Sequence, residues 1–458
     1  MKQRETFKSR LGFLLLSAGC AIGIGNVWRF PYVVGANGGG FFVLFYLLFL
    51  AIMGVPVLSM EFAVGRASKK SPVKAYQELE RPGQKWHLHG YVALFGNYML
   101  MMFYTTVAGW MLYYFYSFFT GRFTGQTTEG VAAAFGEMLA SPGINVFWMV
   151  LVVIVGIFIC SMGLQKGVER ITKWMMIGLL SLMVILAVHG AFLEGGTEGL
   201  KFYLLPDIGK MKEVGIGNVI VAAMNQSFFT LSLGIGAMAI FGSYLGRDNT
   251  LLGEAVNVAV LDTFVAITAG LIIFPACFAF GVSPDSGPSL IFITLPNVFI
   301  SMPGGRVWGS LFFLFMSFAA FSTVIAVFEN ILACDMELFE IDRKKSAWLN
   351  LGLIILLSLP CALGFNLLAG FEPLGAGSAV LDLEDFIVSN LLLPLGSLIY
   401  LLFATWKSGW GFEKYQAEAN QGAGLKVPSW IRFYVKYILP IMILGLFLEG
   451  IWSKFFAH

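Results

Sequence analysis

The chain has 458 residues, of which 58% are hydrophobic and 12% are charged, and its formal net charge is +2. A soluble domain carries about 25% charged residues, so this composition excludes an ordinary soluble protein and predicts a polytopic membrane protein. The small net charge gives no indication of a nucleic-acid partner.

Eleven apolar runs are long enough to cross a bilayer as helices, which takes about 20 residues. The predicted spans are 11–37, 41–64, 90–120, 145–162, 168–192, 216–243, 252–281, 306–334, 347–367, 380–405 and 430–452. No soluble domain or low-complexity tract separates them, so residues 1–458 are expected to form one domain. The longest polar connections are 64–89, 121–143, 193–215 and 406–429.

Lysine and arginine indicate the orientation of the chain. They gather in the N-terminal segment, in the 64–89 connection and at 343–345. Cytoplasmic loops close to span ends are enriched in these residues. We therefore predict a multi-pass protein of the cell (inner) membrane. Its N-terminus would be cytoplasmic and, because the number of spans is odd, its C-terminus extracytoplasmic.

The first span contains Gly19, Gly23 and Gly25, followed by Asn26 and Pro31. Each glycine costs a helix about 1 kcal/mol relative to alanine, and proline lacks a backbone donor, so the helix is predicted to break here. Unpaired peptide groups inside a bilayer are tolerated only against buried protein or a wet cavity. The break therefore predicts a solute or ion site, with a glycine-rich packing face as the alternative.

The sixth span is interrupted in the same way over 226–236, where hydroxyl residues and two glycines follow one another. Two interrupted segments at corresponding places in two five-span halves are typical of an inverted-repeat transporter. The predicted fold class is all-α, with about eleven transmembrane helices. The first five-helix repeat would cover 11–192, the inverted second repeat 216–405, and an additional span 430–452.

Few side chains at membrane depth are suited to bind a cation. The oxygen donors are Asn26, Thr230, Asp262, Ser322 and Thr323. Free amides at half-helix N-termini suit a carboxylate, and unwound carbonyls suit a small hard cation, so an amino acid together with Na+ fits both. Asp262 stands out because an unpaired carboxylate at this depth costs several kcal/mol. The alternative is that Asp262 has only a packing role, with its carboxylate hydrogen-bonded to serine or threonine.

Three segments resemble the neurotransmitter:sodium symporters, in particular their bacterial amino-acid transporter branch. They are residues 19–31, Phe228-Phe229-Thr230-Leu231-Ser232-Leu233-Gly234 and Ala319-Ala320-Phe321-Ser322-Thr323. The resemblance runs from Arg4 to about Thr405 and implies ten core helices in two inverted halves. It also implies Na+-coupled import of an amino acid by alternating access, by a monomer or dimer that is not an enzyme and carries no organic cofactor.

The resemblance implies two Na+ sites built from oxygen atoms, as a hard cation requires. The first would combine the substrate carboxylate with one carbonyl and three side chains, from Ala21, Asn26, Thr230 and Asp262. The second would combine three carbonyls with two hydroxyls, from Gly19, Ile22, Ala319, Ser322 and Thr323.

The substrate would lie between the two breaks. The resemblance places its carboxylate at the backbone near Gly25 and at the Tyr104 hydroxyl, and its amine at carbonyls around Ala21, Phe229 and Thr230. The pocket for its side chain would be mostly apolar, with Leu100, Tyr104, Phe229, Ser232, Ile235, Thr323 and Val327. Burying a charged side chain there would cost several kcal/mol, which predicts a neutral, hydrophobic amino acid.

Two positions of the predicted sites depart from the family's pattern. Asp262 replaces a commoner asparagine, and its fixed charge predicts transport that does not need chloride. Gly23 stands where amine-selective members carry an aspartate, which favours an α-amino acid over a monoamine.

Gates are also implied by the resemblance. Arg29 and Asp385 would form the extracellular pair, with Phe229 as the hydrophobic lid beneath them. The cytoplasmic pair would join Arg4 to an acid near the end of the eighth span, with Tyr244 close by. That acid would be Glu337 or Asp335.

Two other classes of function are weighed against the transporter. A membrane-embedded enzyme is disfavoured because the four histidines lack metal-ligand spacing and no hydrolase motif occurs; His87 and His89 are expected to be solvated beside the basic connection. A non-transporting amino-acid sensor would keep the same pocket, so the sequence leaves that alternative open. A channel is possible on composition, but no filter motif is present.

Overall fold

The computed structural model describes residues 5–281 and 290–456. In these ranges nine helices are long and apolar enough to cross a membrane, and the pair α1 (Arg10–Ala21) and η1/α2 (Gly25–Ala36) forms a further span bent by 56°. The sixth span is also divided, into α12 (Ile216–Phe229) and α13 (Ala237–Tyr244). The predicted all-helical architecture with interrupted first and sixth spans is therefore confirmed.

The remaining spans agree with the predicted apolar runs. They are α3 (Gly40–Phe49) with η2 (Leu50–Gly54) and α4 (Val55–Ser68), α6 (Leu88–Phe119), α8 (Pro142–Ser161), η3 (Leu164–Glu169) with α9 (Arg170–Ala191), α14 (Leu251–Ala279), α16 (Gly305–Leu338), α17 (Arg343–Leu363), α18 (Val380–Phe386) with η5 (Ile387–Leu392) and α19 (Leu393–Thr405), and η6 (Ser429–Ile431) with η7 (Tyr434–Ile438) and α21 (Leu439–Phe455).

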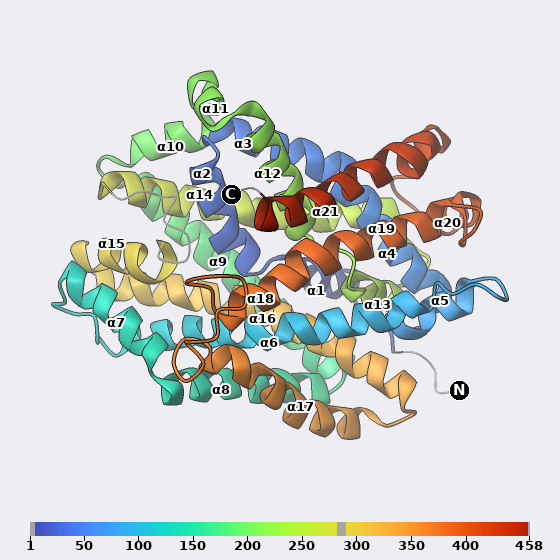
Figure 1. Cartoon of the computed structure of the whole chain (residues 1–458), viewed down its shortest axis with the longest axis horizontal. Coiled ribbons are helices and arrows are strands. Elements are labelled where there is room, and N and C mark those ends of the chain that lie inside the picture. The colour runs from blue at the N-terminus through green and yellow to red at the C-terminus, as the bar shows by residue number, and fades with distance from the viewer. Residues whose placement is uncertain (1–4, 282–289, 457–458) are drawn as a thin grey trace.

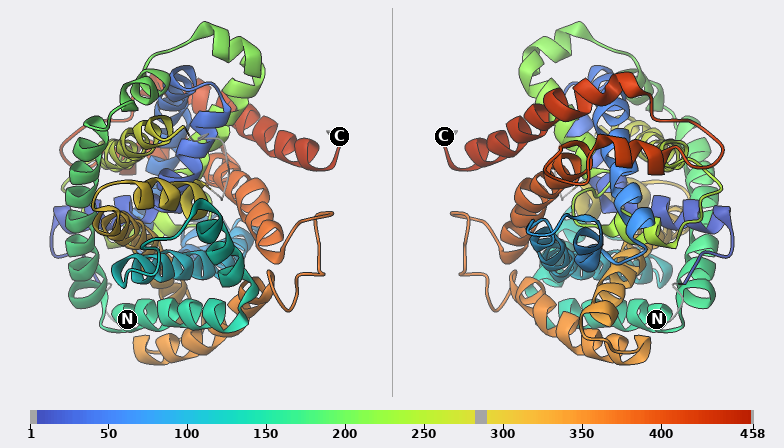
Figure 2. Two further views of the ribbon diagram at one scale, coloured as in Figure 1. Left: turned by 90° about the vertical axis from the view of Figure 1, so that its left-hand side faces the viewer. Right: turned by 90° about the vertical axis from the view of Figure 1, so that its right-hand side faces the viewer.

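Several polar connections are more ordered than the sequence pattern indicates. They contain the short helices α5 (Pro72–Leu79), α7 (Thr128–Ala140), α10 (Gly196–Leu204), α11 (Ile208–Val214) and α20 (Phe412–Ala419). A further short helix, η4/α15 (Leu290–Ser301), is apolar and lies between α14 and α16. Figure 1 shows α7, α10 and α15 at one end of the bundle and α5 and α20 at the other. The end-on views of Figure 2 place α21 at the periphery, with its last turns pointing away from the other helices.

Prolines inside three spans do not end them. Pro56, Pro394 and Pro440 each stand at the start of an α-helix that follows a π-helical turn. A π turn widens the helix locally, which accommodates the missing donor and the ring of proline without a break. The true interruptions are at 22–24 and 230–236, where glycines rather than proline decide the path of the backbone.

One expectation about the surface is wrong. His89 is only 5% exposed, because α5 folds back against the start of α6 and covers it. His87 behaves as predicted from its neighbourhood, since it is partly exposed and lies 2.5 Å from the Glu80 carboxylate. The hydropathy of the connection gives no sign that α5 packs on the membrane helices.

The second break is held by a carboxylate from α4. The backbone of the second break passes through the left-handed region at Ser232, Gly234 and Gly236, with φ of 49°, 101° and 78°. Glu61 is fully buried and accepts the amide of Gly234 at 3.1 Å and the amide of Met238 at 3.2 Å. It thereby satisfies donors at the start of α13 that have no intrahelical partner.

A second group holds the same stretch from α6. The Asn97 side-chain amide donates to the carbonyl of Ile235 at 2.7 Å, and Asn330 on α16 donates to the Asn97 oxygen at 3.0 Å. All three side chains that frame the second break, Glu61, Asn97 and Asn330, are fully buried. The interruption is therefore a built element of the fold rather than a loosely packed turn.

We predict that Glu61→Gln destabilises the protein by about 2 kcal/mol, because an amide NH2 would face a backbone donor and leave a buried N–H unpaired. Hydrogen exchange of the amides at 234–238 should accelerate, and the melting temperature in detergent should fall. Glu137→Gln is the control, since Glu137 is 70% exposed. Equal behaviour of the two variants would contradict the role given to Glu61.

Candidate functional site

A cavity of about 340 Å³ opens between the two broken spans. This volume lies at the lower end of the range for small-molecule sites. Its lining comes from the first break and the half-helix after it, α6, the second break, α16, and α18 with its continuation. The residues are Ala21, Gly23, Ile24, Gly25, Trp28, Arg29, Tyr32, Leu100, Phe103, Tyr104, Val107, Phe229, Ser232, Thr323, Leu381, Asp382, Asp385, Val388 and Leu393.

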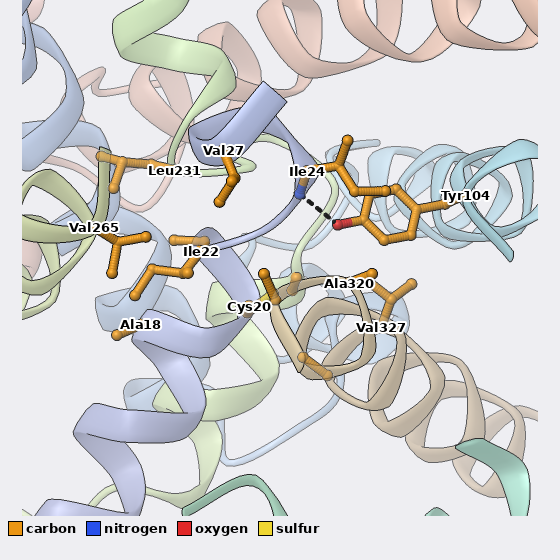
Figure 3. Packing of buried hydrophobic residues seen from close by; sticks show 14 of the residues in the cluster. Ala18, Cys20, Ile22, Ile24, Val27, Tyr104, Leu231, Val265, Ala320 and Val327 are labelled. Carbon is orange, nitrogen blue, oxygen red and sulfur yellow. Dashed lines mark hydrogen bonds between the residues drawn. The ribbon is translucent and has the colours of Figure 1, made fainter. Parts of the chain in front are cut away.

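The first break presents its backbone to this cavity. The helix α1 ends at Ala21, Ile22 turns to an extended conformation, and the Ile24 amide donates to the Tyr104 hydroxyl at 3.0 Å (Figure 3). Tyr104 therefore stands at the start of the second half-helix. The Tyr104 hydroxyl still has its own O–H to donate, and the N-terminus of the half-helix carries the positive end of a helix dipole, so a carboxylate would be suited to this place.

Two glycines of the first break face groups that leave no room for a side chain. A Cβ at Gly23 would lie 2.4 Å from the Tyr104 hydroxyl and 2.7 Å from the Thr323 hydroxyl. A Cβ at Gly25 would lie 2.6 Å from the Phe229 ring. A side chain at either position would therefore push the neighbouring side chains aside, and an aspartate at position 23 would displace Tyr104.

Three predicted cation ligands meet beside the breaks. Asp262 on α14 accepts the Asn26 side-chain amide at 2.7 Å and the Thr230 hydroxyl at 2.8 Å. All three side chains are at most 1% exposed. Across the described residues, no lysine, arginine or histidine forms an ion pair with Asp262. Its charge is therefore surrounded by neutral groups.

A second set of oxygen atoms lies between α1 and α16. The Ser322 hydroxyl is 3.2 Å from the Ile22 carbonyl and 2.9 Å from the Ala319 carbonyl. The Thr323 hydroxyl is 3.4 Å from the Gly19 carbonyl. These five groups are the predicted second set of ligands. Because α1 ends here, its last carbonyls lack helical partners and carry the negative end of the helix dipole.

The proposed gate residues line the same cavity. The Arg29 guanidinium lies 4.0 Å from the centre of the Phe229 ring, a cation–π contact. Asp385 faces the cavity and accepts the Ser389 hydroxyl at 2.7 Å. Arg29 and Asp385 do not form a direct ion pair in the described structure.

Not every residue predicted for the pocket lines it. Leu100, Tyr104, Phe229, Ser232 and Thr323 do. The lining omits three further predicted residues, which are buried nearby: Thr230, Ile235 and Val327. Thr230 is turned toward Asp262, and Ile235 packs against Gly96 of α6.

The cavity also has walls that the sequence analysis missed. They are Ile24, Trp28, Tyr32, Phe103, Val107, Leu381, Asp382, Val388 and Leu393. Phe103 and Val107 follow Leu100 and Tyr104 at helical spacing, so the periodicity of α6 contained a usable signal. The residues of α18 and its continuation carry no such signal, because only the packing of that span against α6 brings them to the cavity.

The other predicted gate is described in part. Arg4 lies outside the described residues. Glu337 accepts the backbone amide and hydroxyl of Ser71 at 2.9 and 2.7 Å, and Asp335 accepts Asn350 and Tyr98 at 2.6 and 3.0 Å.

Tyr244 has an acidic partner that the sequence analysis did not name. Its hydroxyl donates to Glu329 at 2.8 Å, and Glu329 also binds Arg343 at 2.6 Å. Glu329 is fully buried on α16, so this ion pair links α13, α16 and α17 at the end of the bundle away from α7.

Comparison with known proteins agrees with this architecture. A model of the sodium:neurotransmitter symporter family matches residues 4–135 and 129–455. The crystal structure of MhsT in complex with L-phenylalanine is 39% identical in sequence, with a TM-score of 0.87, covering 98% of this chain and 100% of that one.

Curated relatives span bacteria, archaea and animals. The sodium-dependent transporter YhdH of Bacillus subtilis (strain 168), itself described as uncharacterized, is 33% identical over 96% of both chains. An uncharacterized sodium-dependent transporter of Methanocaldococcus jannaschii is 30% identical, over 96% of this chain and 89% of the relative. The sodium-dependent serotonin transporter of Drosophila melanogaster is 26% identical, over 98% and 77%. The chain therefore belongs to the sodium:neurotransmitter symporter family and is a sodium-dependent, multi-pass membrane transporter.

Proposed function

We propose that this protein imports a neutral, hydrophobic amino acid together with Na+ by alternating access, without a requirement for chloride. The observation that carries the proposal is the cavity between two interrupted helices, with oxygen clusters beside it and an apolar wall from α6. Residues 11–192 and 216–405 would be the two inverted repeats of a single domain, and 430–452 the additional span.

The Asp262 cluster supports the first Na+ site. A buried carboxylate without a cation is costly, and two neutral donors compensate only part of the loss of hydration. A Na+ ion held by Ala21, Asn26, Thr230 and Asp262 would supply the missing positive charge. Because this carboxylate is part of the protein, a chloride ion is not needed to balance the charge of the bound Na+.

The Ser322 and Thr323 hydroxyls with the Gly19, Ile22 and Ala319 carbonyls support a second Na+ site. All five ligands are neutral oxygens, and the α1 C-terminus adds the favourable end of a helix dipole. The set joins α1 to α16, so Na+ bound there would hold the first half-helix against its neighbour.

The chemistry of the cavity supports an α-amino acid as substrate. Its carboxylate would meet Gly25 and Tyr104, and its amine the carbonyls of Ala21, Phe229 and Thr230. Leu100, Phe103 and Val107 offer apolar surface to the substrate side chain. MhsT, a solved relative, is described in complex with L-phenylalanine, which supports a hydrophobic substrate here as well.

Arg29, Phe229 and Asp385 would form the outer gate, and the end with α5 and α20 would face the cytoplasm. The basic residues around 64–89 support this orientation. A partly hydrated ion pair forms and parts at low cost, which suits a gate that opens in every cycle. The assembly would be a monomer or dimer.

We expect proteoliposomes containing the purified protein to accumulate a hydrophobic amino acid only under an inward Na+ gradient. Replacing chloride by gluconate should leave the rate unchanged. Lysine and glutamate should not compete, since their charged side chains would be buried without partners. Saturable binding with no accumulation would instead favour an amino-acid sensor.

Asp262→Asn should raise the Na+ concentration needed for half-maximal thermal stabilisation by at least tenfold, equivalent to about 1.4 kcal/mol of binding free energy. The reason is the loss of the negative charge at the first Na+ site. Asp207→Asn, at the exposed N-cap of α11, is the control. An unchanged Na+ dependence would remove Asp262 from the site.

Asp385→Asn should lower the rate of uptake at least tenfold while shifting the melting temperature in detergent by no more than a few degrees, because a hydrated gate pair contributes little to stability. Parallel losses of uptake and stability would argue against a gating role for Asp385.

A further inference from the structure

Four buried polar side chains lie against the second break and have no part in the transport site described above. They are Tyr76 on α5, His89 on α6, and Ser397 and Tyr400 on α19, here called the His89 cluster. His89 is 5% exposed and the other three are 0% exposed. Neither ring nitrogen of His89 nor any of the other three hydroxyls makes a hydrogen bond of good geometry among the described residues. The Tyr76 and Tyr400 hydroxyls face each other, and His89 faces the Gly234 peptide group, without closing such a bond.

The three rings of the cluster form a compact triangle. The ring centres of Tyr76 and His89 are 5.4 Å apart, those of His89 and Tyr400 are 5.4 Å apart, and those of Tyr76 and Tyr400 are 5.3 Å apart. His89 stands nearly perpendicular to both tyrosines, at 83° and 84°. The three rings are therefore gathered in one place, although they come from three separate elements.

The cluster borders the backbone that begins α13. A Cβ at Gly236 would lie 3.1 Å from the Tyr400 hydroxyl, and a Cβ at Gly234 would lie 2.7 Å from the Ser397 amide nitrogen. The same stretch is held by Glu61 through the Gly234 and Met238 amides. Both Glu61 oxygens are thus occupied by the backbone.

Buried polar groups in native proteins are almost always hydrogen-bonded, and those without a protein partner are commonly satisfied by internal water. Five buried polar atoms on these neighbouring side chains, none with a hydrogen bond of good geometry to the protein, offer donors and acceptors enough for such molecules. We propose that the His89 cluster binds a small group of internal water molecules. These bridge its side chains to one another and to the peptide groups of the second break, and so position the start of α13.

The proposed water site has a consequence for the transport site. Thr230 and Ser232 belong to the same interruption as Gly234 and Gly236, so a shift of α13 would be passed to the cavity and to the Asp262 cluster. His89 and the tyrosines are then positioning residues. The proposal concerns the fold of the second break and does not depend on which substrate the protein carries.

Radiolytic hydroxyl labelling in H2¹⁸O tests for the water directly, because buried side chains react only where water lies beside them. We expect Tyr76, His89 and Tyr400 in the detergent-purified full chain to be modified several-fold faster than Tyr114. Tyr114 is the internal control: it is equally buried, and its hydroxyl donates to the Phe292 carbonyl. Labelling of the cluster at the rate of Tyr114 would overturn the proposal.

Removing a single hydroxyl should change the melting temperature in different ways in a hydrated and in a dry cluster. With water present, Tyr400→Phe and Tyr76→Phe should each lower the melting temperature and speed hydrogen exchange at 234–238. Tyr203→Phe, which removes an ordinary buried hydrogen bond to the Ile267 carbonyl, calibrates the expected loss. In a dry cluster the same changes remove an unsatisfied group, so an unchanged or raised melting temperature would contradict the proposal. Neither readout requires transport, so failure of the proposed function would leave this test intact.

Discussion

The structure depends on the satisfaction of peptide groups that have left a helix inside a membrane. Lipid offers no hydrogen bonds, so each unwound amide and carbonyl must find a partner in the protein or in a wet cavity. At the first break the Ile24 amide finds the Tyr104 hydroxyl, and at the second break the Gly234 and Met238 amides find Glu61. The carbonyls at the ends of α1 and α12 remain available to ligands.

The different partners of the amides and carbonyls explain why the site lies between the two breaks. Amides of the second half-helices are held by fixed partners on α4 and α6, whereas the Gly19 and Ile22 carbonyls lie beside the Thr323 and Ser322 hydroxyls. An assembly of oxygens around one buried carboxylate attracts a positive charge, and neutral side chains of α6 close the other side of the cavity. The polar and apolar walls together favour a zwitterion with an apolar side chain.

Helix α14 illustrates how one residue changes the balance of charge. Asp262 brings a carboxylate to a point where it accepts hydrogen bonds from the neutral side chains of Asn26 and Thr230. Electrostatic attraction is strongest where water is excluded, so this charge acts on a cation far more effectively than one at the surface. The proposed independence from chloride follows from that placement.

The sequence by itself determined the membrane class, the spans and both interruptions, because apolar length and glycine content are local properties that lipid enforces. It also identified candidate cation ligands, since polar residues are rare in such segments: Asn26, Thr230, Asp262, Ser322 and Thr323. Only the tertiary structure decided what surrounds them. The contribution of α18 to the cavity, the use of Glu61 at the second break and the burial of His89 beneath α5 all depend on packing between segments distant in sequence. No local pattern records these contacts, because the same amphipathic or apolar helix could pack against many neighbours.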